Sequence, residues 1–145
     1  LAAGAEYDIT DNWKISGGYH HFFDSDAKMA NDKQQYINGG VNEYLLGSEY
    51  KIGKKFLISA GGQISRTAVT DDFQTDLSFG LNSMSFGFGG AVDITENLRL
   101  NLACMITGYS DWTKETSNYN ATTLAGKDVY ARTSKAFGIG LDYKF

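Results

Sequence analysis

The sequence predicts an all-β protein, built as an antiparallel up-and-down β-barrel that spans a membrane. Three observations predict this fold. Apolar and polar residues alternate over segments of about ten residues, which is the pattern of barrel strands. Short turns alternate with long polar segments along the chain. The composition includes 17 Gly and no Pro, which suits a curved sheet because Pro cannot donate to a β-ladder and Gly relieves crowding.

Seven segments carry the alternation, and we expect each to form a strand of one domain that covers residues 1–145. They are residues 1–9, 13–24, 43–52, 56–67, 84–94, 98–109 and 133–145. In the last segment, the odd positions from Phe137 to Phe145 are apolar or aromatic, whereas the even positions are Gly or charged. Successive side chains of a strand point to opposite faces, so one face should be apolar and the other small or polar.

The connections between these strands are of two kinds. Residues 10–12, 53–55 and 95–97 form tight turns, whereas residues 25–42, 68–83 and 110–132 are long and polar. Bacterial outer-membrane barrels have short periplasmic turns and long extracellular loops. The strand pattern already runs at Leu1, and a closed bacterial barrel needs an even number of strands. We therefore expect seven strands that form the C-terminal fragment of a larger barrel.

The composition of the face with small residues indicates whether the apolar face is buried inside the protein or faces lipid. A soluble barrel or sandwich would show the same alternation with its apolar side buried, and this is the alternative. The opposite face would then meet water and would carry many long charged residues. Here Gly, Ser and Ala dominate that face. This composition favours a crowded lumen inside the barrel and an apolar face in contact with lipid.

Aromatic residues near the short turns predict a membrane girdle, because their rings favour the lipid headgroup level. The predicted girdle comprises Tyr7, Trp13, Tyr50, Phe56, Tyr143 and Phe145. Its counterpart toward the long loops would comprise Tyr19, Phe23, Tyr44 and Met84.

Charged residues on the small face also gather near the short turns. Asp8 could pair with Lys14, and Asp93 with Arg99, across their hairpins. The same set includes Glu6, Glu49, Lys51, Asp142 and Lys144. These lumen charges could form a polar gate or a docking ring for a hatch, or they could simply solvate the lumen and set the register.

The long loops contain apolar side chains that could form a groove for an apolar ligand. The candidates are Phe22, Met29, Tyr36, Phe73 and Phe79, with Ile37 and Leu77 beside them. The alternative is that these loops pack on one another.

Other classes of site are not expected. His20 and His21 are adjacent, so a strand places them on opposite faces and they cannot chelate one metal. Asp24, Asp26, Asn31 and Asp32 lack the spacing of an EF-hand, which favours a solvated loop over calcium. Cys104 is the only cysteine, so the chain cannot form an internal disulfide. We expect no enzymatic activity and no cofactor, because no nucleophile has a base near it.

Charge excludes one further class of partner. The formal net charge is −4 and no stretch is strongly basic, which argues against nucleic-acid binding.

The final residues, GIGLDYKF (138–145), resemble the outer-membrane β-signal, a terminal Phe preceded by apolar or aromatic residues at alternating positions. Ile139, Leu141, Tyr143 and Phe145 carry the match. The resemblance implies recognition by the barrel-assembly machinery.

A closer resemblance extends over most of the chain. It rests on GYHHFFD (18–24), NEYLLGSEY (42–50), SFGFG (85–89) and RTSKAFGIG (132–140). Together these segments resemble the C-terminal half of the FadL/OmpP1 family of hydrophobic-compound transporters, particularly its Bacteroidetes branch. That resemblance implies a fourteen-stranded barrel in the bacterial outer membrane, plugged by an N-terminal hatch, that passively takes up long-chain fatty acids or other hydrophobic compounds. No ligand-binding residue is carried over, because the hatch and early strands would precede Leu1.

The resemblance also implies the partners, which are membrane lipid and lipopolysaccharide, a hydrophobic small molecule and the assembly machinery. The alternative is a small structural or adhesive barrel, similar to the OmpA and OmpW types, whose loops bind a partner.

Overall fold

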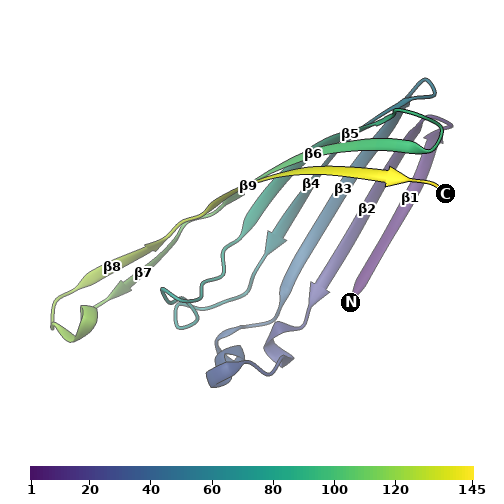
Figure 1. The fold of residues 1–145 in the computed structure, drawn as a ribbon. Coiled ribbons are helices and arrows are strands. Elements are labelled where there is room, and N and C mark those ends of the chain that lie inside the picture. The colour runs from purple at the N-terminus through teal and green to yellow at the C-terminus, as the bar shows by residue number, and fades with distance from the viewer.

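The computed structural model describes residues 1–145, except for the side chain of Asn120. Within these residues the chain forms a seven-stranded sheet and a separate two-stranded hairpin (Figure 1). The strands of the sheet are β1 (Ala2–Thr10), β2 (Trp13–Phe22), β3 (Val41–Ile52), β4 (Phe56–Arg66), β5 (Ser83–Asp93), β6 (Leu98–Tyr109) and β9 (Thr133–Tyr143).

The sheet is an antiparallel meander in the order β1-β2-β3-β4-β5-β6-β9. Every neighbouring pair is antiparallel, as the sequence predicts. The predicted strand ends differ from these bounds by at most two residues. The sheet is open, and β1 and β9 are its edge strands.

The third long connection differs from the prediction of a polar loop. Residues 110–132 contain a β-hairpin of β7 (Trp112–Thr116) and β8 (Gly126–Tyr130). The alternation within it covers only five residues on each side, too short for a barrel strand. Thr113, Val129 and Tyr130 nevertheless favour strand structure. The hairpin projects beyond β6 and β9 in Figure 1.

Short 3₁₀ helices complete the connections at the same end. They are η1 (Asp24–Asp26), η2 (Ala30–Tyr36) and η3 (Tyr119–Ala121). Among the described residues, no helix is long and apolar enough to cross a membrane.

The register keeps the two faces of the sheet in phase across all seven strands. One row of directly opposed residues runs Asp8, Lys14, Glu49, Ser59, Gly89, Ala103, Gly138. The row on the other side runs Tyr50, Ile58, Gly90, Leu102, Ile139 across β3 to β9. We call the first side the polar face and the second the apolar face. A slip of one residue in any strand would exchange its two sides.

The sheet is a single layer without a second layer to bury its apolar face. In the described part of the chain, Ile37 and Tyr130 are the only buried hydrophobic residues, and both lie outside the sheet. On the apolar face, Phe137 is 83% exposed and Ile139 is 76% exposed. Ser85 and Thr107, on the polar face, are only 8% and 5% exposed. The larger side chains are therefore on the more exposed side.

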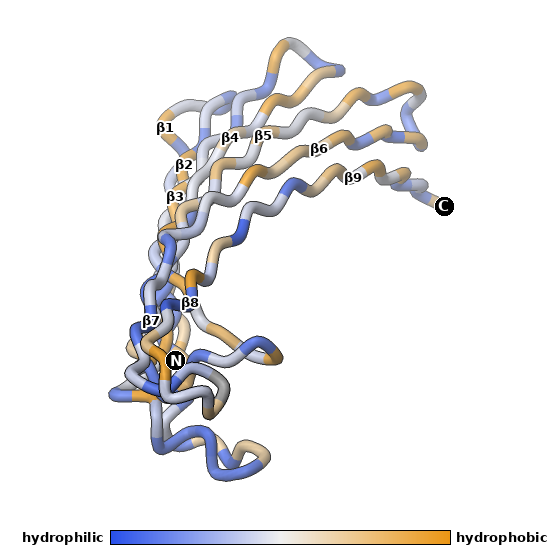
Figure 2. The backbone as a smooth tube through the Cα atoms, turned by 90° about the vertical axis from the view of Figure 1, so that its left-hand side faces the viewer, coloured by the Kyte–Doolittle hydropathy of each residue, from blue (hydrophilic) through white to orange (hydrophobic). Residues whose placement is uncertain are grey.

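The two ends of the sheet have different connections. Figure 2 shows the long connections gathered at one end and the short turns at the other, where the chain ends. The N-terminus lies toward the long connections in Figure 1. We refer to these as the loop end and the turn end.

Candidate functional site

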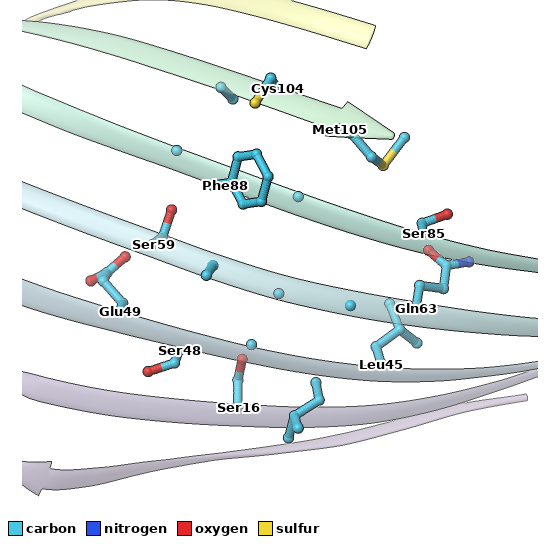
Figure 3. Close-up of a pocket in the computed structure, with 18 of the residues that line it drawn as sticks. Ser16, Leu45, Ser48, Glu49, Ser59, Gln63, Ser85, Phe88, Cys104 and Met105 are labelled. Carbon is cyan, nitrogen blue, oxygen red and sulfur yellow. The ribbon is translucent and has the colours of Figure 1, made fainter. Parts of the chain in front are cut away.

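A groove of about 670 Å³ crosses the polar face. Most of its floor is formed by residues with little or no side chain, because Gly47, Gly61 and Gly87 are directly opposed in one register row, which continues through Met105 to Ala136. Figure 3 shows short polar side chains, such as Ser16 and Ser59, around these positions. The groove therefore has a floor without charged side chains, and an extended molecule could lie against it.

Both ends of this groove are marked by larger side chains. Glu6, Lys14 and Glu49 line it toward the turn end. Leu45 and Gln63, which are directly opposed, line it toward the loop end (Figure 3). The loop end is also fixed by a buried hydrogen bond of 2.8 Å between the Ser85 and Thr107 hydroxyls.

One of the two ion pairs predicted among the charged residues near the short turns is confirmed. Arg99 donates two hydrogen bonds to Asp93, from Nε at 2.7 Å and from Nη2 at 3.1 Å. Beside this pair, Asn101 Nδ2 donates to the Asp142 carboxylate at 2.8 Å. These contacts tie β5, β6 and β9 together near the turn end.

The other predicted ion pair, between Asp8 and Lys14, is wrong, because Lys14 pairs with a different carboxylate. Lys14 and Asp8 are directly opposed in the register, yet the Lys14 ammonium lies 2.8 Å from Glu6 instead. Glu6 pairs with Lys14 because its side chain is longer than that of Asp8 and meets the long Lys14 side chain diagonally on the same face. Asp8 and Glu49 remain as neighbouring carboxylates on either side of Lys14.

The two histidines lie on opposite faces, as predicted. On the polar face, His20 Nδ1 lies 3.3 Å from the Glu43 carboxylate. On the apolar face, His21 Nδ1 lies 2.9 Å from Asn42 Oδ1, which also accepts the Tyr19 hydroxyl at 2.6 Å. No single ion can therefore contact both rings.

The oxygen-bearing loop residues have structural contacts of their own. The Asp24 carboxylate accepts the backbone N–H of Val41 at 3.1 Å. Gln34 donates weakly to Asp32 at 3.4 Å. Asn31 and Asp32 both adopt left-handed backbone, with φ of 58° and 52°. Asp24 thus closes the start of β3.

The aromatic residues predicted for a girdle lie on the apolar face near the turn end. Trp13 opposes Tyr50, and Phe56 opposes Ile52. The Trp13 indole donates to Ser48 Oγ at 2.9 Å. Tyr7 lies on the same face of β1. At the loop end of this face the Tyr19 and Tyr44 rings stack at 5.3 Å.

The residues that resemble an assembly signal follow the edge strand β9. Ile139, Leu141 and Tyr143 lie on its apolar face, opposed by Leu102, Leu100 and Leu98 of β6. Phe145 follows the strand, and its ring packs edge-on against Tyr143 at 5.3 Å. All four side chains are mostly exposed, so the free edge of the sheet presents a continuous apolar and aromatic row.

The three long connections pack on one another and form what we call the loop cap, residues 23–40, 67–82 and 110–132. An isolated β-bridge joins Ile37 to Val69. Lys33 crosses between the first two connections and donates to the Phe73 carbonyl at 3.2 Å and to Thr75 at 3.3 Å. The hairpin joins them, because Trp112 donates to Asp71 at 2.7 Å. Among the residues whose burial is described, Ile37, Gln74 and Tyr130 are buried in this cap.

The loop residues proposed as ligand contacts are not gathered in one pocket. The Lys33 ammonium lies 4.8 Å above the Phe73 ring, and Phe79 stacks on Tyr130 at 5.4 Å. Phe22 is about half exposed at the end of β2, and Met29 and Tyr36 are half-buried. The groove on the polar face contains none of the five. The alternative of loops packing on one another describes Phe73 and Phe79 better.

Two tyrosines in the cap have altered acidity. The nearby Asp128 carboxylate raises the pKa of the Tyr119 phenol above its ordinary value, mainly by charge repulsion of the phenolate. Burial raises the pKa of Tyr130, and Asp128 adds to the effect. Both groups therefore favour the neutral phenol.

No protein-family model matches the chain, and no curated protein matches it either. The arrangement of the sheet, its two faces and its loops therefore carries the functional argument.

Proposed function

We propose that this chain forms part of the wall of a closed β-barrel in a bacterial outer membrane. The observation that carries the proposal is the single-layer sheet with a broad exposed apolar face and a polar opposite face. Soluble proteins rarely leave so large an apolar surface uncovered. In a barrel of this kind lipid covers the apolar face, and the polar face encloses the lumen.

The height of the apolar face supports a membrane. Tyr44 and Ile52 lie eight positions apart on β3, which is about 27 Å along an antiparallel strand. A tilt of about 40° reduces this to about 21 Å, close to the roughly 25 Å apolar band of outer-membrane barrels. Aromatic residues lie at both limits, with Tyr50 and Phe56 toward the turn end and Tyr19 and Tyr44 toward the loop end.

The directions of the two edge strands determine how many further strands are needed to close the sheet into a barrel. β1 and β9 both run from the loop end to the turn end. A second copy in the same orientation would have to pair these edges in parallel, unlike every pair in the sheet. An odd number of further strands, beginning and ending in the opposite direction, closes the barrel with antiparallel pairs throughout.

We further propose that the complete barrel passively takes up long-chain fatty acids or other hydrophobic compounds. The groove on the polar face supports this, because its floor of Gly, Ala and Met105 leaves space along the wall, and its charged side chains, Glu6, Lys14 and Glu49, are confined to the turn end. The resemblance to the FadL/OmpP1 family points the same way. This chain would supply barrel wall, extracellular loops and the signal for the assembly machinery, with lipid and lipopolysaccharide around it.

The second candidate is a small structural or adhesive barrel whose loops bind a partner. The loop cap favours it, since it exposes several apolar side chains, among them Leu77 at 99% and Leu124 at 68%. Such exposed apolar side chains at loop tips suit a partner surface.

Uptake by the complete protein separates the two candidates. The native protein would be extracted from its outer membrane, its intact mass measured, and the protein reconstituted into liposomes that contain a fatty-acid reporter. A transporter has a mass near three times that of this 15.9 kDa chain, because about fourteen strands and a hatch must fit, and it accelerates fatty-acid entry. A mass near that of eight strands, with entry equal to that of empty liposomes, would contradict the transport proposal and favour adhesion.

A further inference from the structure

A second groove, of about 1080 Å³, lies on the apolar face and has no part in the lumen. Its walls include Phe56, Ile58, Phe88, Leu102, Phe137 and Ile139. The register explains the hollow, because Gly90 lies between Ile58 and Leu102 in one row and offers no side chain. The groove is thus an open apolar depression between large side chains, which we call the channel.

A single basic residue lies at the loop-end limit of this groove. Lys135 is on the apolar face of β9, opposite Ile106 and two residues before Phe137. Phe137 lines the groove, so Lys135 lies one register step beyond it toward the loop end. The row of Tyr44 and Met84 is one step farther along the strands.

The apolar face holds no carboxylate to neutralise Lys135. Among the described residues of the seven strands, every acidic side chain lies on the polar face, namely Glu6, Asp8, Glu43, Glu49, Asp93 and Asp142. Besides Lys135, the charged side chain of the apolar face is Arg66, which opposes Asn42 at the loop end. Charge on this face is therefore basic and confined to one end.

We propose that this groove binds one bilayer lipid with an anionic phosphate headgroup, its phosphate at Lys135 and an acyl chain in the channel. A lysine on a lipid-facing strand is costly unless its ammonium reaches the headgroup level or a partner charge. A phosphate supplies that charge, and the apolar walls suit an acyl chain running toward the bilayer centre. This inference rests on the proposed membrane location.

The unique cysteine provides a reporter within the groove. Cys104 lines it, so the complete protein can be labelled there with a small bimane fluorophore, provided that no other cysteine is present or the others are replaced. The labelled protein would be reconstituted into phosphatidylcholine vesicles with a minor fraction of brominated phosphatidylglycerol or of brominated phosphatidylcholine. Bromine quenches only when its acyl chain is next to the fluorophore.

We expect brominated phosphatidylglycerol to associate with the groove about fivefold more strongly, the preference that one lysine gives near an anionic headgroup. Lys135→Gln should abolish this preference, and Lys135→Arg should retain it. The matched control is Lys51→Gln, on the polar face of the same sheet, which should change nothing. Free inorganic phosphate should not compete, because the site also needs the acyl chain.

Three results would overturn the inference. Equal quenching by both lipids in the inserted wild-type protein would exclude a headgroup preference. Protection from both lipids would mean that protein covers the groove. Failure of the protein to insert into any vesicle would overturn the membrane proposal and this inference together, whereas the first two results leave the membrane proposal standing.

Discussion

Replacing Gln74 with Ala should loosen the second connection of the loop cap, residues 67–82, while leaving the seven-stranded sheet intact. Gln74 is fully buried. Its side-chain amide donates to the Gly80 carbonyl at 2.8 Å and accepts the Gly80 N–H at 2.9 Å. Its own carbonyl accepts the Lys114 ammonium of the hairpin at 3.3 Å. The side chain therefore holds the segment 74–80 of the second connection in shape, while the backbone carbonyl of the same residue contacts the hairpin.

The expected cost follows from these two side-chain hydrogen bonds. Each contributes about 1 kcal/mol net, so their loss should destabilise the cap by about 2 kcal/mol. That corresponds to a roughly thirtyfold larger open population. Backbone hydrogen exchange across residues 70–82 would report it, because exchange from local opening scales with that population.

Two further variants make the test specific. Gln74→Glu keeps the acceptor for Gly80 N–H but sets a carboxylate against the Gly80 carbonyl, so we expect a loss at least as large. Gln35→Ala removes an exposed glutamine of η2 and should leave exchange unchanged. If Gln74→Ala exchanges like the wild-type protein, the amide does not hold the cap and our assignment of its core is refuted.

Three other perturbations test local features of the structure. Gly40→Ala should disrupt the start of β3, because a Cβ there would lie 1.7 Å from the Phe22 carbonyl oxygen; the control Gly108→Ala, with open space around it, should be tolerated, and equal thermal stability of both variants would contradict the packing described. Thr123 has a φ of 62°, so Thr123→Gly should relieve about 1 kcal/mol of backbone strain and slow proteolysis of the hairpin tip, whereas faster cleavage would show that the strain is absent. Tyr119 should ionise above its ordinary pKa of about 10 because of Asp128. Its contribution to cap stability is thus complete below about pH 10 and lost as pH rises through the raised pKa. Tyrosinate absorbance should show an earlier transition in Asp128→Asn, and an unchanged titration would argue against that repulsion.

The sequence by itself determined the seven strands of the sheet and the two sides of each. Alternation is a local property of a strand, so it can be found without knowledge of the neighbours. The apolar and small sides of separate strands then had to meet in phase, since a slip of one residue would mix them. For this reason the rows that contain Tyr50 and Glu49 run unbroken across the sheet, and the Asp93–Arg99 pair was predictable from one tight hairpin.

Tertiary structure alone decided the features that depend on distant segments. The alternation of the hairpin is short, and its packing depends on contacts of Trp112 and Tyr130 with residues 71–79, which no local pattern encodes. Buried Gln74 looks like any polar loop residue in the sequence. Lys14 forms its ion pair with Glu6 and not with Asp8, because the length of the side chains, and not the strand register, determines which carboxylate the ammonium contacts. The channel below Lys135 likewise exists only because strand pairing places Gly90 between two large side chains.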